Sequence, residues 1–367
     1  CYRKGQRYYA IFKGCLKDEP TLKTKTKVRV FQAAPLAFSL LVRKYFLSIV
    51  RIMSLNPLES ECAVGVNSQG PEWDQLARHM MKFGEDRILA GDYSKYDLRM
   101  PAQLIQSAFW ILIQIAQQCG YSDDDIVIME GIASDISLPL VAYNGDLIQL
   151  FGSNPSGHNL TVYINSIVNS LLLRCAYYDI EGVASPHFSS RVAIMTYGDD
   201  VKGSVSPVLT KYNHLTVAEF LGKYDIVFTM PDKESIPTPF MSDKDADFLK
   251  RKNVFNDELG IYMGCLEEMS IYKSLHCVLA SKSVTPREVA AMNIGGALRE
   301  WFQYGRDYYD DKLKQMRLIA ERANLTHMIP ELEFSYDYLL DNFRAKYLTP
   351  VEYLSLQKGR DNVVGGH

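Results

Sequence analysis

The stretch RVAIMTYGDDVKGSV (Arg191–Val205) places two carboxylates, Asp199 and Asp200, side by side after the apolar residues Val192–Met195. This order predicts a strand, a tight turn that carries both carboxylates, and a second strand. A Gly-Asp turn is common in hairpins, so one interpretation is a simple turn. Adjacent carboxylates, however, repel each other and raise each other's pKa. We favour a buried strand that delivers them to divalent cations, because these hard cations bind several oxygen ligands.

A second acidic pair lies well before this turn, in the stretch GDYSKYDLRMP (Gly91–Pro101). Asp92 ends an apolar strand, and Asp97 follows after a Tyr-Ser-Lys-Tyr turn. Two acids at this spacing are by themselves usually surface residues. Together with Asp199, we expect Asp92 to share two divalent ions, which can activate an attacking hydroxyl and stabilise a leaving pyrophosphate.

A polar stripe is predicted on the helix that follows the loop in NPSGHNLTVYINSIVNS (Asn154–Ser170). Thr161, Asn165 and Asn169 recur every four residues and so share one helix face. One interpretation is a helix with some buried, hydrogen-bonded amides. We favour a stripe that lines a site, because a flexible Ser-Gly loop leads directly into it. We expect His158 to be a loop or template contact rather than a metal ligand.

The net charge of −3 hides an uneven distribution. Residues 1–51 carry twelve Lys or Arg and two acidic residues, whereas the remaining chain carries twenty-eight bases and forty-one acids. A basic segment beside an acidic body suits a protein that holds both phosphates and metal cations. A solvated basic surface is the alternative. Alternating lysines over residues 17–33 predict a strand or extended ribbon with one cationic face.

The 367 residues are 47% hydrophobic, which suffices for a large core. Seven scattered cysteines without a C-x-x-C pair suggest neither a disulfide framework nor a zinc site, and favour a reducing, intracellular setting. The apolar segment Pro101–Gly120 is interrupted by glutamines, so we expect a buried helix and no transmembrane segment. Because the chain starts at Cys1 without a signal pattern, we expect a piece of a longer precursor.

The second half of the sequence is predicted to be mainly helical beyond about residue 270. Thr285–Glu288 has capping-box spacing, with proline at the first helical position. A long amphipathic stretch follows from Ala297 to Asn324. Near the middle of the chain, Ser122 is expected to cap a further helix. The pattern as a whole predicts an α+β protein with a helical C-terminal lobe.

Three of these segments together resemble motifs A, B and C of viral RNA-dependent RNA polymerases, closest to those of picornavirus-like positive-strand RNA viruses. Motif A is matched by Asp92-x4-Asp97, and motif C by Tyr197-Gly198-Asp199-Asp200. Motif B is matched by Ser156-Gly157-x3-Thr161-x3-Asn165-Ser166. The order of the motifs and their separations of tens of residues also match.

Further segments resemble the motifs that surround this centre in the family. The basic ribbon of motif F is matched by Lys17-Asp18-Glu19 and Lys27-Val28-Arg29. The segment FTMPDKES resembles motif D and points to Lys233 as its lysine. Phe248-Leu249-Lys250-Arg251 resembles motif E.

The resemblance implies a right-hand polymerase with a palm of antiparallel sheet and helices, fingers, and a helical thumb. The expected division is fingers at 1–85, palm at 86–120, a fingers insertion at 121–152, palm at 153–269, and thumb at 270–367. Family members carry more residues before the motif F lysine, so the N-terminal fingers are expected to be truncated.

The resemblance also implies a role for each matched residue. Catalytic roles fall to Asp92, Asp199, Asp200 and Lys233, and binding of two Mg²⁺ or Mn²⁺ ions to Asp92, Tyr93, Asp199 and Asp200. Nucleotide binding falls to Lys17, Lys27, Arg29, Asp97, Ser156, Gly157, Thr161 and Asn165. Primer or template contacts fall to Tyr197, Lys250 and Arg251.

The implied function is RNA synthesis from nucleoside triphosphates on an RNA template and primer, for replication of a viral genome. Asp97 and Asn165 offer hydrogen-bond partners to a 2′-hydroxyl, which argues against a reverse transcriptase. A non-catalytic RNA-binding scaffold is a third hypothesis, disfavoured by the intact acidic residues. Relatives suggest a small viral protein primer, and membrane-associated replication complexes in the host cytoplasm.

Overall fold

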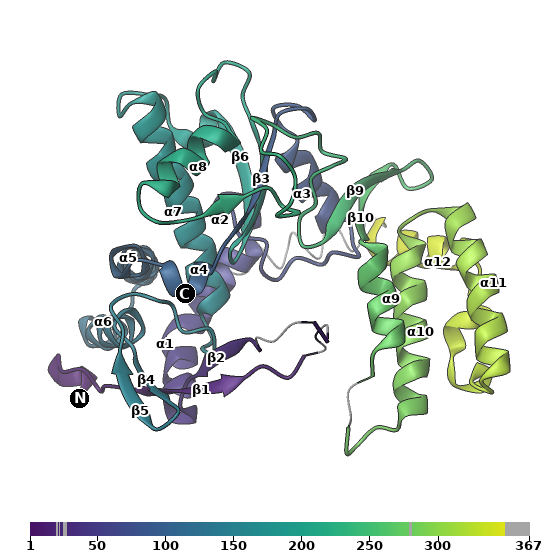
Figure 1. Cartoon of the computed structure of the whole chain (residues 1–367), viewed down its shortest axis with the longest axis horizontal. Coiled ribbons are helices and arrows are strands. Elements are labelled where there is room, and N and C mark those ends of the chain that lie inside the picture. The colour runs from purple at the N-terminus through teal and green to yellow at the C-terminus, as the bar shows by residue number, and fades with distance from the viewer. Residues whose placement is uncertain (20, 22, 25–27, 279–280, 349–367) are drawn as a thin grey trace. The chain divides into compact units, whose positions relative to one another are not determined.

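The computed structural model of the chain describes residues 1–19, 21, 23–24, 28–278 and 281–348 (Figure 1). The chain forms two units. The first consists of Cys1–Gly65 and His79–Ala246, and the second of Val66–Arg78 and the chain from Asp247 onward. Helix α3 (Glu72–Met80) begins in the second unit and ends in the first.

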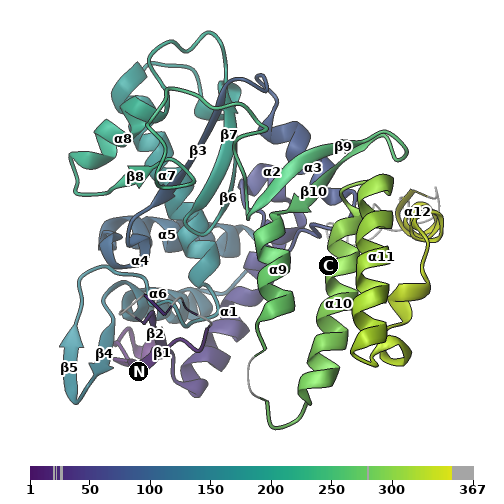
Figure 2. The same ribbon diagram turned by 45° about the vertical axis from the view of Figure 1, so that its right-hand side comes forward.

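An antiparallel sheet with the order β6-β7-β3-β8 forms the centre of the first unit (Figure 2). Its strands are β3 (Ile88–Tyr93), β6 (Val192–Tyr197), β7 (Asp200–Val205) and β8 (Phe228–Thr229). Both β3 and β6 are buried along nearly their whole length, as expected for strands that are apolar on both faces. Gly203 of β7 lies so close to β6 that an added Cβ would stand 2.1 Å from the Ala193 carbonyl oxygen.

Two helices pack against this sheet. Helix α7 (Thr161–Glu181) contacts β6 and α8 (His214–Gly222), and α8 contacts β3 and β8. Asn213 closes the start of α8 with a capping box. Helix α4 (Tyr96–Arg99) is a single turn that follows β3. The end of β3, the β6–β7 turn and the first turns of α7 therefore belong to one packed layer.

A second sheet of the first unit has the order β2-β1-β4-β5. Its strands are β1 (Ile11–Leu16), β2 (Val30–Ala33), β4 (Leu140–Tyr143) and β5 (Asp146–Gln149). β1 pairs antiparallel with β2 and parallel with β4. Helices α1 (Leu36–Leu55) and α6 (Asp123–Ser137) accompany this sheet (Figure 1), and the short helix α2 (Pro57–Ser60) contacts α1.

The sequence predicts a strand or an extended ribbon over residues 17–33. Among the described residues of this segment, Val30–Ala33 is a strand, and it pairs with the earlier segment Ile11–Leu16. Between these two strands, residues 23–24 form a turn, and the other described residues have no regular secondary structure. Period-two alternation of Lys and Thr gives no apolar face to bury, and burial of one face is what holds a strand in a sheet.

The apolar segment Pro101–Gly120 forms helix α5 (Ala102–Gln118), as expected for a buried helix. Its inner face packs into the core of the first unit through Ile105, Ala108, Phe109, Leu112 and Ala116. Helix α6 beside it begins with the predicted cap at Ser122, which forms a capping box with Asp125. Across the described residues, no helix combines the length and the apolar character that a bilayer crossing requires.

The second unit joins a β-hairpin to a group of helices. The hairpin pairs β9 (Arg251–Asn256) with β10 (Ile261–Leu266). The helices are α9 (Glu268–His276), α10 (Pro286–Phe302), α11 (Arg306–Arg322) and α12 (Tyr336–Phe343). Their core is built around aromatic side chains, among them Trp301, Tyr309 and Tyr336.

Two expectations for this unit can be compared with the structure. The capping box at Thr285 is present at the start of α10. The amphipathic stretch Ala297–Asn324 is not one helix, because it breaks between α10 and α11 at Gly305, whose φ is 98°. A glycine adopts this conformation without the steric cost that a side chain would add.

The predicted division into fingers, palm and thumb stays a prediction. The boundaries of the two units do not coincide with the boundaries predicted for these subdomains. Residues 247–269, predicted as palm, belong to the second unit, and so does Val66–Arg78, predicted as fingers. All seven cysteines are free, as their spacing predicts.

Candidate active site

The β6–β7 turn places Asp199 beside the end of β3. Tyr197 pairs with Asp200 as the last rung of the hairpin, and Gly198 turns the chain with a φ of 68°. Gly91 of β3 pairs with Val201, so the next residue, Asp92, lies next to the turn. The pKa of Asp199 is raised, first by burial and then by the negative charges of Asp92 and Asp97. The three carboxylates therefore form one electrostatically coupled group.

Side chains from α7 and β3 hold the turn in place. The Gly198 backbone N–H donates to Ser166 Oγ at 2.8 Å, and Asn169 Nδ2 donates to the Gly198 carbonyl at 3.2 Å. The Tyr93 hydroxyl donates to Asn169 Oδ1 at 3.0 Å. Asn169 is thus a buried structural amide, and the buried Tyr93 side chain is bound to it. Burial raises the pKa of Tyr93.

Lys233 forms an ion pair with one of the acidic residues predicted to bind metal. Its Nζ lies 3.0 Å from Asp92 Oδ2, and its backbone adopts a φ of 67°. Among the residues that the structure describes, no three His, Cys, Asp or Glu side chains are grouped so that they could hold a metal ion. Lys233 thus neutralises part of the charge of Asp92 in this arrangement, and the metal-binding role predicted for Asp92, Asp199 and Asp200 stays a prediction.

The donor chemistry of this group nevertheless suits a hard cation. Asp92 and Asp199 contribute carboxylate oxygens, the ligands that Mg²⁺ prefers. The pKa of Asp199 is raised first by burial and then by repulsion from the carboxylates of Asp92 and Asp97. A bound cation would remove this repulsion. The residues present therefore fit a divalent metal.

Asp97 and Asn165 form a hydrogen-bonded pair close to the coupled carboxylates. Asn165 Nδ2, on the second turn of α7, donates to Asp97 Oδ1 on α4 at 2.6 Å. Burial raises the pKa of Asp97, while the hydrogen bond from Asn165 and the charges of Arg29 and Lys17 oppose that rise. The two basic residues therefore act on this pair, although they are far from it in sequence.

The basic residues of the β1–β2 connection are mostly exposed. Lys17 and Arg29 share Glu19 as an ion-pair partner, at 3.8 and 3.5 Å. The Lys17 backbone N–H donates to the Arg29 carbonyl at 2.9 Å, so the two residues lie opposite each other where the β1–β2 connection begins and ends. Lys27, also predicted to bind nucleotide, lies outside the described residues.

The loop before α7 docks against β2. Ser156 contacts the Gln32 side chain through its backbone N–H and its hydroxyl, both at 3.2 Å. Gly157 pairs with Ala33, and a Cβ there would stand 2.3 Å from the Gln32 carbonyl oxygen. Only glycine fits this approach, which explains the Ser-Gly sequence. Thr161 closes the loop by donating to the Pro155 carbonyl at 2.9 Å.

The residues predicted to contact primer or template are placed differently. Tyr197, at the end of β6, is partly exposed. Lys250 is exposed in the second unit and lies 3.6 Å from Glu267. Arg251 is largely buried, and its guanidinium is bound by both carboxylate oxygens of Glu300 at 2.7 and 2.9 Å. This pairing gives Arg251 a structural role within the second unit.

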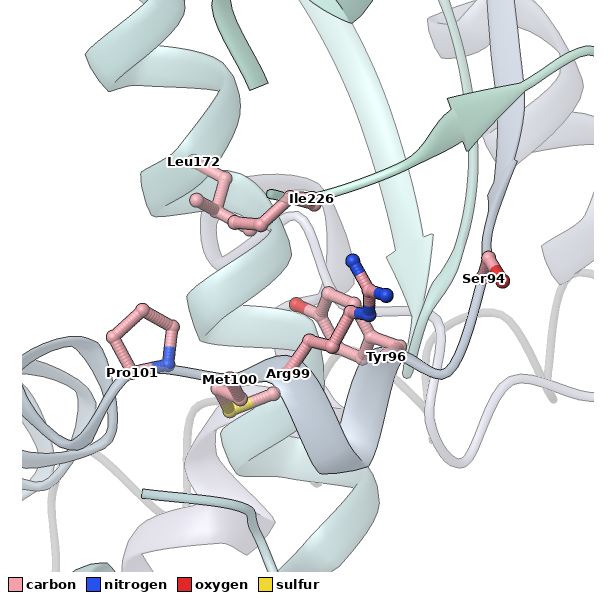
Figure 3. Close-up of a pocket in the computed structure, with 7 residues that line it drawn as sticks. All are labelled: Ser94, Tyr96, Arg99, Met100, Pro101, Leu172 and Ile226. Carbon is pink, nitrogen blue, oxygen red and sulfur yellow. The ribbon is translucent and has the colours of Figure 1, made fainter. Parts of the chain in front are cut away.

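Neither of two cavities in the first unit contains the carboxylates. One, behind α4, is lined by Ser94, Tyr96, Arg99, Met100, Pro101, Leu172 and Ile226 (Figure 3). Its volume of about 10 Å³ leaves room for no more than about one water molecule. The other, of about 320 Å³, is lined by apolar side chains together with Glu59, Ser60, Glu61, Ser170 and Arg174.

Sequence reasoning missed a buried part of the site. His158, expected as a loop or template contact, is only 8% exposed and Asn154 is fully buried. His158 Nε2 lies 2.8 Å from Asn154 Oδ1, and Asn154 Nδ2 donates to Asn165 Oδ1 at 2.7 Å. Neither residue falls on the four-residue stripe of the helix, so no periodic signal in the sequence could have identified them.

Comparison with known proteins places this geometry in a family. The chain is 29% identical over 367 residues to a replicase polyprotein of Drosophila C virus, and 28% identical over 354 residues to that of Cricket paralysis virus. These alignments cover 96% and 92% of the chain, but the chain spans only about a fifth of the length of either polyprotein. A solved structure, the Sicinivirus 3Dpol RNA dependent RNA polymerase, matches with a TM-score of 0.76.

That structural match covers 95% of this chain and 70% of the Sicinivirus chain at 20% sequence identity, so it shows the fold alone. It confirms the predicted mixed helix and antiparallel-sheet polymerase fold. Residues 1–320 match the sequence profile of the family described as Viral RNA-dependent RNA polymerase. This match includes the sheet, the β6–β7 turn and the α7 helix that form the candidate site. The chain therefore belongs to the viral RNA-dependent RNA polymerase family.

Proposed function

We propose that this chain carries the nucleotidyl-transfer centre of a template-directed RNA polymerase, which adds nucleotides from nucleoside triphosphates to an RNA primer 3′-hydroxyl. The observation that carries the proposal is the position of Asp92 and Asp199 at the end of β3 and in the β6–β7 turn, beside the Asp97–Asn165 pair. Membership of the polymerase family and the match to a solved polymerase support it.

Asp92, Asp199 and Asp200, with the backbone carbonyl of Tyr93, would hold two Mg²⁺ or Mn²⁺ ions. When bound, such ions lower the pKa of the primer hydroxyl and neutralise the charge of the triphosphate. Asp92 must release Lys233 to accept a cation, since one of its oxygens contacts that ammonium. Ser166 and Asn169 keep the turn that carries Asp199 fixed, so its carboxylate needs little rearrangement.

The basic residues would receive the triphosphate. Lys17 and Arg29 are exposed and lie near enough to Asp97 to shift its pKa, so they face the same space. Arg29 can bind phosphate oxygens bidentately, which a lysine cannot. Lys27 belongs to the same proposal by sequence alone. Released from Asp92, Lys233 would hold a proton at its Nζ for the departing pyrophosphate.

The sugar would be selected by Asp97 and Asn165. A 2′-hydroxyl both donates and accepts hydrogen bonds, and this pair offers a carboxylate acceptor next to an amide donor. A 2′-deoxyribose would leave the second Nδ2 proton of Asn165 and the remaining acceptor positions of Asp97 without the partner that a 2′-hydroxyl supplies, which disfavours it. The pair therefore supports an RNA polymerase over a reverse transcriptase. A comparison of NTP and dNTP incorporation on one RNA template decides between them.

The remaining predicted contacts are proposed with narrower roles. Ser156, Gly157 and Thr161 form the loop that positions the nucleotide opposite the template, and Tyr197 and Lys250 contact the primer or template. We no longer assign Arg251 to the primer, because Glu300 already binds its guanidinium. RNA template, RNA primer and nucleoside triphosphates are the proposed partners, with a small viral protein as a further primer. Membrane-associated replication complexes in the host cytoplasm are the proposed location.

Primer extension on a self-priming RNA hairpin with the four NTPs and Mg²⁺ tests the proposal. The unmodified chain is expected to extend the hairpin, and Asp199→Ala to lose extension by several orders of magnitude. Circular dichroism and hairpin binding should be unchanged in that variant. Robust extension by Asp199→Ala would refute the role of Asp199. Binding without extension by the unmodified chain would instead support a non-catalytic scaffold.

A further inference from the structure

We propose that His158 and Asn154 are positioning residues that fix the orientation of the Asn165 amide and thereby the preference for a 2′-hydroxyl on the incoming sugar. This inference rests on the proposed function, because it concerns the sugar that Asp97 and Asn165 receive. Neither residue touches the nucleotide. Each acts through a continuous series of hydrogen bonds that begins in the loop before α7 and ends at Asp97.

Each hydrogen bond in this series has a defined direction. The Leu160 backbone N–H donates to His158 Nδ1 at 3.2 Å. In a neutral imidazole whose Nδ1 accepts, the proton resides on Nε2. His158 Nε2 therefore donates to Asn154 Oδ1 at 2.8 Å. Asn154 Nδ2 then donates to Asn165 Oδ1 at 2.7 Å, and Asn165 Nδ2 donates to Asp97 Oδ1 at 2.6 Å.

The surroundings keep His158 in this role. The ring is buried, and burial lowers its pKa to about 3, so it is neutral at physiological pH. Asn154 is anchored to the same pair from its backbone, since its N–H donates to the Asp97 carbonyl at 3.0 Å. Its Nδ2 also donates to the Thr161 carbonyl at 3.3 Å. The Asn154 residue thus connects the loop before α7 to the start of α7 and to α4.

This series of hydrogen bonds decides which donor and acceptor groups face the sugar. Because Asn154 occupies Asn165 Oδ1, the Asn165 amide presents only N–H groups towards Asp97. If the Asn165 amide were reversed, its oxygen would face the Asp97 carboxylate and repel it. The fixed orientation offers a donor and an acceptor side by side, as a hydroxyl requires. Without the His158 donor, Asn154 Oδ1 would be a buried acceptor without a partner, which costs free energy. The Asn154 amide would avoid this cost by turning away from Asn165.

A matched pair of substitutions separates this role from simple packing. In His158→Gln, the side-chain amide nitrogen can occupy the place of Nε2 and keep the donor to Asn154. In His158→Asn, the shorter side chain can replace Nδ1 but cannot reach Asn154. Asn154→Ala removes the link directly while leaving its backbone N–H to hold Asp97. None of the three substitutions changes the charge of the site. Asn154→Ala also removes the hydrogen bonds of its side chain to His158 and to the Thr161 carbonyl.

The readout is the ratio of kcat/KM for an NTP to kcat/KM for the matching dNTP, measured on the RNA hairpin. We expect His158→Asn and Asn154→Ala to lower this ratio about tenfold through loss of NTP efficiency, as for one lost hydrogen bond. Incorporation of dNTP should stay near its original efficiency, and His158→Gln should keep the original ratio. Because both substrates are measured on one preparation, the ratio does not depend on the folded fraction.

Two results would overturn the inference. One is an unchanged ratio in both His158→Asn and Asn154→Ala, which would mean that the Asn165 amide is oriented without them. The other is an equal fall of NTP and dNTP efficiency, which a merely structural role predicts. Failure of the unmodified chain to incorporate any NTP would refute the proposed function itself, and is distinguished by this control.

Discussion

Asp199 lies in a turn where burial and the charges of Asp92 and Asp97 all disfavour its ionised form. A carboxylate whose pKa is raised on folding binds its proton more tightly in the folded state than in the unfolded state. Its contribution is therefore unfavourable at neutral pH, and disappears as the pH falls below the ordinary Asp pKa of 3.8. The ionised Asp199 therefore lowers the free energy of unfolding, and it adds to a group of negative charges to which a cation can bind.

This sign gives a prediction for Asp199→Asn. In EDTA at pH 7.5 the variant should melt at a higher temperature than the unmodified chain, because the amide removes the repulsion. The difference should shrink as the pH approaches 3.8. Mg²⁺ should raise the melting temperature of the unmodified chain more than that of the variant. A variant that melts lower in EDTA, with its secondary structure intact, would contradict the coupling among these carboxylates.

At the same scale, the sequence predicted some site residues and missed others for a physical reason. Asp92, Asp97 and Asn165 could be found because strand ends and helix periodicity place them at regular positions. His158 and Asn154 lie in an irregular loop, where spacing says nothing about direction. Only the fold shows that both are buried and joined to Asn165.

Among the elements, the β9–β10 hairpin is joined to α10 by the ion pair between Arg251 and Glu300. Arg251 binds Glu300 through two nitrogens and also donates to the Gly264 carbonyl at 2.7 Å. Gln303 and Gln69 each donate to Glu300 as well. The pair is thus largely desolvated and fully hydrogen-bonded, the condition in which removing one partner costs most.

Arg251→Ala should therefore lower the free energy of unfolding by on the order of 3 kcal/mol, because Glu300 is left as a buried, uncompensated charge. Arg251→Ala/Glu300→Ala should lower it by less than the sum of the two single variants. Lys250→Ala is the matched control and should change stability little, since that side chain is exposed. Urea unfolding measures the unmodified chain and all four variants. Equal stability of Arg251→Ala and Lys250→Ala would contradict the structural role of Arg251.

Elements were predictable where a burial pattern or a cap marked them. The turn at Asp199, the caps at Ser122 and Thr285, and the buried character of α5 follow from local chemistry. The alternation over residues 17–33 is polar on both faces, and among the described residues there only Val30–Ala33 is a strand. The break at Gly305 was missed because the apolar periodicity continues across it, while the glycine conformation that separates α10 from α11 depends on packing.

At the scale of the whole molecule, composition predicted the class of fold but not its division into units. The chain enters the second unit with the short segment Val66–Arg78, returns to the first unit, and enters the second unit again at Asp247. No change in composition marks the ends of that short segment. Such discontinuous units are set by contacts between residues that are distant in sequence. The histidines are unevenly divided as well. The three with lowered pKa, His79, His158 and His214, all belong to the first unit.

These histidines predict acid sensitivity of the first unit. Burial is the main cause of each lowered pKa, so the unfolded state binds protons that the folded state rejects. Their lowered pKa costs no stability above pH 6.5, the ordinary histidine pKa, and the free energy of unfolding falls as the pH drops below that value. Each histidine can contribute up to about 1.4 kcal/mol per pH unit.

Urea unfolding between pH 7.5 and 5.0 measures this slope, and His214→Asn is the variant that tests its origin. His214 Nδ1 lies 3.2 Å from the Ala90 carbonyl, and an asparagine amide can keep that donor without titrating. Loss of the ring stacked on Phe228 lowers the stability of the variant at every pH, so the slopes are compared rather than the absolute values. In the variant, the dependence of the unfolding free energy on pH should be smaller by about the contribution of one histidine. Identical slopes in the two proteins would show that buried histidines do not control the acid response, and that carboxylates of the salt bridges do.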